Sequence, residues 1–153
     1  AFVKNSYVGR TFIKPKQSSR ESAVRIKLNV LKEAVAGKRV IMIDDSIVRG
    51  TTSALIVGML RDAGAKEVHV RISAPPFLHP CYFGTDIPSK DQLIAHNRTV
   101  EEIRDLLGAD SLSYLEMDRL YEMAGGKPIC TACFSGDYPI EPPKEDIRGS
   151  YEK

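Results

Sequence analysis

The sequence lacks the features that mark several common classes of protein. No run of apolar residues approaches the ~18 positions that a membrane-spanning helix needs. Only three cysteines occur among 153 residues, too few for the disulfide framework of a secreted protein, so a cytoplasmic location is expected. The net charge is only +2, so the charge balance gives no reason to expect nucleic acid as a partner.

Two common nucleotide-binding motifs are missing as well. A Walker loop needs a lysine immediately before its serine or threonine, and a dinucleotide fingerprint needs three spaced glycines. Neither pattern follows the strongest predicted strand. The histidines form no recognisable catalytic set. The function must therefore be sought in other patterns.

The sequence does contain an alternation of predicted strands and helices. Its 42% hydrophobic composition over 153 residues suits one domain with a substantial core. Apolar runs and helical periodicities predict strands at 39–43, 68–72 and 112–115, and helices at 51–63, 100–107 and 118–124. This alternation is typical of an α/β protein with a parallel sheet flanked by helices.

Local patterns refine three of these elements. Residues 99–102 have the spacing of a capping box, which predicts the start of the helix that follows. The apolar run 39–43 is typical of a fully buried strand. Residues 24–35 fit both a helix and a strand, and we expect an extended strand that turns at 36–38 into strand 39–43.

The most informative segment is 44–52, which reads Asp-Asp-Ser-Ile-Val-Arg-Gly-Thr-Thr. It lies between the predicted strand 39–43 and helix 51–63, so backbone N–H groups should gather at a positive helix end. The two aspartates stand at the carboxyl edge of the strand, where open α/β sheets bind ligands. A phosphate together with magnesium or sugar hydroxyls would suit such a site, which indicates a phosphorylated sugar. The alternative is that one aspartate caps the turn and the other is solvated.

Several segments together carry a resemblance to a known family. Residues 40–53 resemble the phosphoribosyl-pyrophosphate (PRPP) signature of type I phosphoribosyltransferases. The particular sequence of residues 44–52 resembles that of the glutamine PRPP amidotransferases. Residues 7–13 resemble the flexible active-site loop of that family. Residues 79–81 and 130–134 resemble the cluster-ligand segments of its iron–sulfur-containing branch.

The resemblance implies an incomplete member of this family. A type I phosphoribosyltransferase-like sheet is expected without its first strands, and the N-terminal glutaminase domain is absent. Residues 1–138 would be the C-terminal part of the phosphoribosyltransferase domain with the cluster-ligand region, and 139–153 a disordered tail. Such a fragment is expected to be inactive alone, and the full-length protein to be a homo-oligomer.

The resemblance also implies an activity and roles for the loop. The family converts PRPP and glutamine-derived ammonia to 5-phosphoribosylamine and pyrophosphate, the first committed step of de novo purine synthesis. Asp44 and Asp45 would hold the ribose hydroxyls directly or through Mg²⁺. PRPP and nucleotide monophosphates are the implied ligands of the loop, with substrate-binding residues Asp44, Asp45, Ser46, Arg49, Gly50, Thr51 and Thr52.

The first 27 residues are strongly basic, with seven lysines and arginines against the single acid Glu21. Read alone, this segment is either a nucleic-acid arm or a solvated face. The resemblance instead implies a mobile lid whose cations meet the pyrophosphate, with Arg10 as the catalytic residue.

The cysteines have several readings. Cys130 and Cys133 form a C-x-x-C pair, which alone could be a redox pair, half of a zinc site, or two unrelated thiols. The resemblance implies that they bind a 4Fe-4S cluster together with Cys81, with the fourth ligand outside this chain. Two rival functions stay open: a PRPP- or nucleotide-sensing regulatory protein with a phosphoribosyltransferase fold, and a metal- or thiol-centred interaction module.

Overall fold

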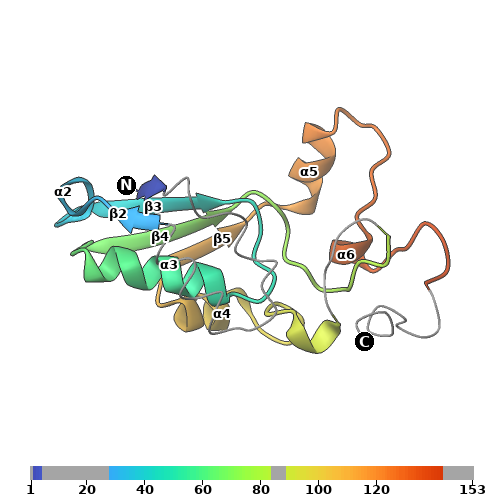
Figure 1. Ribbon diagram of the computed structural model, residues 1–153. Coiled ribbons are helices and arrows are strands. Elements are labelled where there is room, and N and C mark those ends of the chain that lie inside the picture. The colour runs from blue at the N-terminus through green and yellow to red at the C-terminus, as the bar shows by residue number, and fades with distance from the viewer. Residues whose placement is uncertain (1, 5–27, 84–88, 143–153) are drawn as a thin grey trace.

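The structure is a computed structural model that describes residues 2–4, 28–83 and 89–142 (Figure 1). Arg10 and the rest of residues 5–27, which hold most of the basic N-terminal segment, lie outside these residues. None of the helices in the described ranges has the length and apolar character needed to span a bilayer. The elements follow in the order β1 (Phe2–Lys4), β2 (Leu28–Val30), α2 (Lys32–Val35), β3 (Arg39–Asp44), α3 (Thr51–Asp62), β4 (Glu67–Ile72), η1 (Lys90–Gln92), α4 (Val100–Leu107), β5 (Ser111–Tyr114), α5 (Met117–Met123) and α6 (Ala132–Ser135).

The centre of the fold is a parallel sheet with the strand order β3-β4-β5. In register, Asp44 lies opposite Ile72, and Ile72 lies opposite Tyr114, so the three strands reach their carboxyl ends at one edge. A separate antiparallel pair is formed by β1 and β2. The prediction of an α/β fold with a parallel sheet and flanking helices is confirmed.

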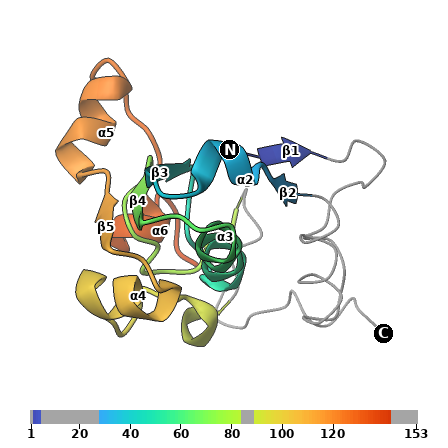
Figure 2. The ribbon, with the colours of Figure 1, turned by 90° about the vertical axis from the view of Figure 1, so that its left-hand side faces the viewer.

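Helices α3 and α4 lie on the same face of the sheet, as the two perpendicular views show (Figures 1 and 2). The alternation predicted for β4 is confirmed, because Val68, Val70 and Ile72 are all buried. From the helices, Val57 and Ile103 are at most 1% exposed. The core therefore lies between one face of the sheet and these two helices.

Strand β3 is not fully buried, so that expectation was wrong. Val40 and Met42 face the helices, whereas Ile41 and Ile43 are 64% and 76% exposed. The physical reason is that β3 is an edge strand of this sheet, and α3 and α4 cover only one of its faces among the described residues. The strand therefore shows the alternation of a half-buried strand, although its residues 40–43 are all apolar.

The segment before β3 also differs from the prediction. Of the described residues 28–35, Leu28–Val30 is extended, and it pairs with β1 instead of turning back onto β3; residues 24–27 lie outside the described part. A single helical turn, α2, follows and places Val35 fully inside the core. Burial of Val35 outweighs its own preference, as a β-branched residue, for extended structure, so tertiary packing decides the local structure here.

The face of the sheet away from α3 and α4 carries a row of polar contacts. Glu67 accepts from Arg39 Nε at 2.6 Å and lies 2.9 Å from His69 Nε2. His69 Nδ1 is 2.9 Å from the hydroxyl of Ser111, which also accepts from Arg71. Hydrogen bonds from His69 and then Arg39 hold the pKa of Glu67 below its usual range. His69 is therefore part of a cross-strand network.

The predicted capping box is present at the start of α4. The Thr99 hydroxyl accepts from the Glu102 N–H at 3.2 Å, and the Glu102 carboxylate accepts from the Thr99 N–H at 2.8 Å. In α4, Ile103 and Leu107 are buried, whereas Leu106 is 57% exposed. The cap fixes the start of the helix that carries one wall of the site described below.

We expect Thr99→Ala to lower the free energy of unfolding by ~1 kcal/mol, because it removes the acceptor for the Glu102 N–H. Thr99→Ser, which keeps a hydroxyl at this position, should stay within experimental error of the parent protein. Urea denaturation followed by circular dichroism measures both. Equal losses from the two substitutions would contradict a capping role for the hydroxyl.

Candidate functional site

Two contacts hold the loop between β3 and α3 in place. Ile47 lies in the middle of the loop and is only 2% exposed, so it anchors the loop in the core. The N–H of Ile94 donates to the carbonyl of Val48 at 2.9 Å, which ties the loop to a segment that follows η1. The loop therefore has a fixed shape although it is a connection on the protein surface.

Gly50 is the residue at which this loop becomes a helix. Its φ of 80° lies in the left-handed region, which favours glycine. A Cβ atom at this position would overlap the Cδ1 atom of Ile94. Both the backbone conformation and the close approach of Ile94 therefore require glycine here.

The N-terminal end of α3 is suited to an anion. Gly50 supplies no side-chain cap, and the first turn contains no acidic residue. The residues that open the helix, Thr51 and Thr52, are exposed. Because the first N–H groups of a helix have no partner within it and lie at its positive end, they can donate to a phosphate. The two threonine hydroxyls lie at the same end.

The two aspartates differ in their surroundings. Asp44 is half-buried at the end of β3, whereas Asp45 is exposed. The Asp45 N–H donates to Asp44 Oδ1 at 3.0 Å, and the Ser46 hydroxyl donates to Asp45 Oδ1 at 3.1 Å. Burial raises the pKa of Asp44 above its usual value; the Asp45 N–H acts in the opposite direction, and the Asp45 charge adds to the rise. A cation or hydroxyl donors at this place would relieve the cost of ionising Asp44.

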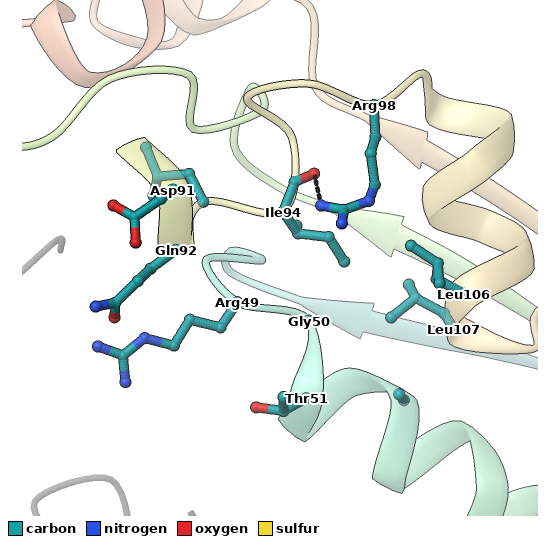
Figure 3. A pocket seen from close by; sticks show the side chains of 11 residues that line it. Arg49, Gly50, Thr51, Asp91, Gln92, Ile94, Arg98, Leu106 and Leu107 are labelled. Atoms are coloured by element: carbon teal, nitrogen blue, oxygen red, sulfur yellow. Dashed lines mark hydrogen bonds between the residues drawn. The ribbon is translucent and has the colours of Figure 1, made fainter. Parts of the chain in front are cut away.

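A pocket of about 340 Å³ opens beside the start of α3 (Figure 3). The side chains of Arg49, Asp91 and Gln92 lie on one side of it, and those of Leu106 and Leu107 lie on the other. The pocket thus combines a polar wall beside the loop with an apolar wall from α4. Polar groups on one side and apolar groups on the other are typical of sites for small molecules.

Arg98 adds a second guanidinium to this pocket. Its Nη1 donates to the carbonyl of Ile94 at 3.3 Å, so the side chain lies across the segment that touches Gly50 (Figure 3). Arg49 and Arg98 give the pocket two permanent positive charges. Both guanidinium groups would attract the phosphate of a ligand bound in this pocket.

The structure brings together only some of the residues predicted for substrate binding. Arg49, Gly50 and Thr51 line the pocket, and Thr52 is the next residue of α3. Asp44, Asp45 and Ser46 lie at the other end of the same loop and do not line it. Their roles in binding stay predictions.

Sequence reasoning missed Asp91, Gln92 and Arg98, which also line the pocket. They follow a long connection and carry no motif. Asp91 and Gln92 belong to η1 and Arg98 follows it, and the Ile94–Val48 hydrogen bond brings this segment against the loop. No local signal in the sequence would have found them.

The cysteines lie in a second region, beyond the carboxyl edge of the sheet. The N–H groups of Leu78 and His79 both donate to the Cys133 carbonyl at 3.0 Å. Burial raises the pKa of the Cys133 thiol, and the charges of Cys81 and Cys130 add to the rise. The backbone of Cys133 therefore lies against the chain that leads to Cys81. Within the described part of the chain, however, no set of three cysteine, histidine or carboxylate groups is arranged to hold a single metal ion.

Comparisons with known proteins bear on both regions. The chain matches no family profile. It is 56% identical over 148 residues to an amidophosphoribosyltransferase of Archaeoglobus fulgidus, covering 94% of this chain and 32% of that protein. It is 57% identical over 145 residues to the amidophosphoribosyltransferase of Synechococcus elongatus, covering 94% of this chain and 29% of that protein.

A solved structure agrees with these relatives. Glutamine PRPP amidotransferase from Bacillus subtilis, in complex with ADP and GMP, superposes with a TM-score of 0.77 at 52% identity. The match covers 94% of this chain and 33% of that one. The chain therefore spans about a third of the length of the proteins it matches.

We expect Gly50→Ala to destabilise the protein in two ways. The left-handed conformation should cost ~1 kcal/mol, and the overlap with Ile94 roughly a further 1–3 kcal/mol. Gly108→Ala is the matched control, because Gly108 has a φ of 70° and open space around its Cβ position, so only the first cost applies. Equal urea midpoints for the two variants would show that the contact with Ile94 has no energetic weight.

Proposed function

We propose that this chain, which is homologous over nearly its whole length to a region of the amidophosphoribosyltransferases, carries the ribose- and 5′-phosphate-binding part of such an enzyme. The observation that carries the proposal is the unit of β3, its loop and α3. It places two aspartates at one end of a rigid loop and an uncapped helix end at the other. Residues 40–53, which resemble the PRPP signature, include most of β3, the whole loop and the start of α3.

The reaction of the whole protein would be the displacement of pyrophosphate from PRPP by ammonia. The bond from C1 of the ribose to the pyrophosphate oxygen breaks, a bond from C1 to nitrogen forms, and the nitrogen gives up one proton. Pyrophosphate leaves with the electron pair of the broken bond. No side chain has to form a covalent intermediate, so the protein acts mainly by positioning the reactants and by electrostatic stabilisation.

The residues of the loop divide the substrate between them. The 5′-phosphate would accept from the first N–H groups of α3 and from the hydroxyls of Thr51 and Thr52, with the charge of Arg49 beside it. Gly50 allows the backbone to come close to the phosphate. The ribose hydroxyls would donate to Asp44 and Asp45, whose arrangement is stabilised by the hydrogen bond from Ser46.

Asp44 and Asp45 also fit a magnesium ion, because hard carboxylate oxygens are the ligands it prefers. When bound, the ion would neutralise charge on the pyrophosphate. The raised pKa of Asp44 supports this role, since a group that ionises at a cost gains most from a nearby cation. Arg10 would meet the same pyrophosphate from the basic N-terminal segment.

The cysteine region fits an iron–sulfur cluster better than a single metal ion. The chain leading to Cys81 lies against the backbone of Cys133, yet the described cysteines are not arranged around one ion. A 4Fe-4S cluster takes one thiolate at each of its irons, so its ligands stand apart from one another. These three would supply three of the four ligands, and the fourth would come from outside this chain. The cluster would serve here as a structural group, away from the phosphate loop.

The remaining parts of the proposal concern the whole protein. Ammonia would come from a glutaminase domain, and the full-length protein would be a homo-oligomer in the cytoplasm. Nucleotide monophosphates would bind the same loop through their own 5′-phosphates, as products of the pathway often do. The complex of the Bacillus subtilis relative with ADP and GMP supports nucleotide binding in the family.

The experiment that tests this function is calorimetric titration with ribose 5-phosphate and with GMP. Asp44→Asn combined with Asp45→Asn should weaken ribose 5-phosphate binding at least tenfold, because the acceptors for the sugar hydroxyls lose their charge. Asp62→Asn, an exposed aspartate at the far end of α3, is the control and should bind like the parent. Unchanged binding in the double variant would refute the assigned roles.

Asp44→Asn alone should make the protein more stable at neutral pH. The raised pKa of Asp44 means that ionising this side chain is less favourable in the folded state than in the unfolded state. The free energy of unfolding of the parent therefore falls as the pH rises through that pKa. Asparagine carries no charge and can still accept from the Asp45 N–H.

Urea midpoints for Asp44→Asn and the parent should therefore differ at pH 7 and converge as the pH falls towards the ordinary pKa of an aspartate. A variant that is less stable than the parent at pH 7 would contradict this account of the site. The same titration of Asp62→Asn controls for loss of a surface charge.

A further inference from the structure

We propose that the segments 77–83 and 130–138 form a clasp in which Tyr138 is a positioning residue that keeps Cys81 beside the C-x-x-C pair. The clasp is built by protein contacts alone, so it holds the thiols together before any metal arrives. This inference deepens the proposed function, because it rests on that proposal for the identity of the group the cysteines bind. It concerns residues that lie outside the phosphate loop.

The first element of the clasp is a backbone contact. The carbonyl of Cys133 accepts two hydrogen bonds, from the N–H groups of Leu78 and His79, each at 3.0 Å. These bonds join segments that are more than 50 positions apart in the sequence. They fix the C-x-x-C end of the clasp against the chain that leads to Cys81, as the neighbouring traces in Figure 1 allow the reader to follow.

The second element is a set of aromatic contacts across the same two segments. Phe77 packs on Phe134 with ring centroids 4.8 Å apart. Tyr138 packs edge-on against Tyr82 at 5.3 Å and against Phe83 at 6.2 Å. Each pair joins one residue from 77–83 to one from 130–138, and such pairs stabilise beyond the area they bury.

Tyr138 contacts the residue that directly precedes Cys81. Its hydroxyl donates to the carbonyl of Pro80 at 2.8 Å, and Pro80 is buried. This carbonyl belongs to the peptide group that also contains the nitrogen of Cys81. Because a peptide group is planar, fixing its oxygen also fixes the direction in which the chain enters Cys81. One hydrogen bond from the far segment thus orients the isolated cysteine.

Gly136 lets the second segment turn closely enough. Its φ is 86°, and a Cβ atom there would lie 3.0 Å from two atoms of the His79 ring. At Gly136 the chain turns close to the ring of His79. This turn lets the hydroxyl of Tyr138 reach the carbonyl of Pro80. A larger residue would hold the two segments apart.

The clasp answers a physical difficulty of this ligand set. Cys130 and Cys133 are neighbours by sequence, but Cys81 must be brought to them across a large loop, and closing such a loop costs entropy. Ligands that are already in place spare the metal this cost when it binds. Because Tyr138 and its partners join the two segments, the entropy of closing this loop is lost during folding and not during metal binding.

Cross-linking with dibromobimane tests the clasp without metal. This reagent alkylates two thiols that lie close together, and it becomes fluorescent only when both have reacted. In the presence of a chelator, peptide mass analysis gives the ratio of cross-links that include Cys81 to those between Cys130 and Cys133. The second kind is an internal control, because both of its thiols lie on one side of the clasp.

We expect Tyr138→Ala to lower this ratio about tenfold and Tyr138→Phe, which loses only the hydroxyl, to lower it about threefold. Tyr121→Phe is the matched control. Tyr121 also bonds to the second segment through its hydroxyl, at 3.2 Å from Thr131 Oγ1, but this bond does not reach residues 77–83. Its ratio should equal that of the parent.

An unchanged ratio in both Tyr138 variants would overturn the proposal. Circular dichroism checks that Tyr138→Ala is folded, and the milder Tyr138→Phe keeps the test decisive if it is not. Binding of GMP to the phosphate loop is measured on the same samples. Loss of GMP binding in every sample would count against the proposed function, whereas only the cross-linking ratio bears on the clasp.

A second readout follows reconstitution with iron and sulfide under anaerobic conditions. The visible absorbance of an iron–sulfur group should develop more slowly, and bleach faster in a chelator, in Tyr138→Phe than in Tyr121→Phe. A purely stabilising role for Tyr138 would instead lower the urea midpoint and leave both rates unchanged.

Discussion

The contact between Gly50 and Ile94 is the constraint on which the candidate site depends. The loop after β3 can turn into α3 only because a residue without a side chain takes a left-handed conformation against the isoleucine. The Ile94 N–H then closes on the Val48 carbonyl. These contacts direct the end of α3 into the pocket, and they bring the segment that carries Asp91 and Arg98 beside it. The contact between Gly50 and Ile94 therefore brings together the end of α3, the pocket and the charged residues that line it.

The two faces of the sheet have different roles in this chain. The face under α3 and α4 contains the core and determines where the strands end, and so where the loop begins. The other face carries a polar row from Arg39 through Glu67 and His69, together with two exposed isoleucines. The region of the cysteines is attached beyond the strand ends by contacts of its own. The candidate site and the cysteine region are thus held by separate sets of interactions.

How much of this could be predicted from sequence depends on how local the determining contacts are. The capping box at Thr99, the alternation of β4 and the glycine-containing loop were predictable, because the residues that decide them are close together in the chain. The exposure of Ile41 and Ile43 was not, since an apolar strand reads the same whether one or both of its faces are covered. The helical turn ending at Val35 was missed for a related reason, because a buried position in the core decides it. The pocket residue Arg98 was beyond reach, because it meets the loop only through the fold.

No strand among the described residues pairs with the outer edge of β3, and this has a consequence for how the molecule behaves in solution. An unpaired strand edge offers a line of main-chain donors and acceptors, and here two isoleucines stand beside it. Any extended peptide that adds to this edge would gain backbone hydrogen bonds and apolar contact at once. Solubility would then be governed by competition among copies for that edge, and a covering layer over Ile41 and Ile43 would protect the protein from self-association as well as complete its core.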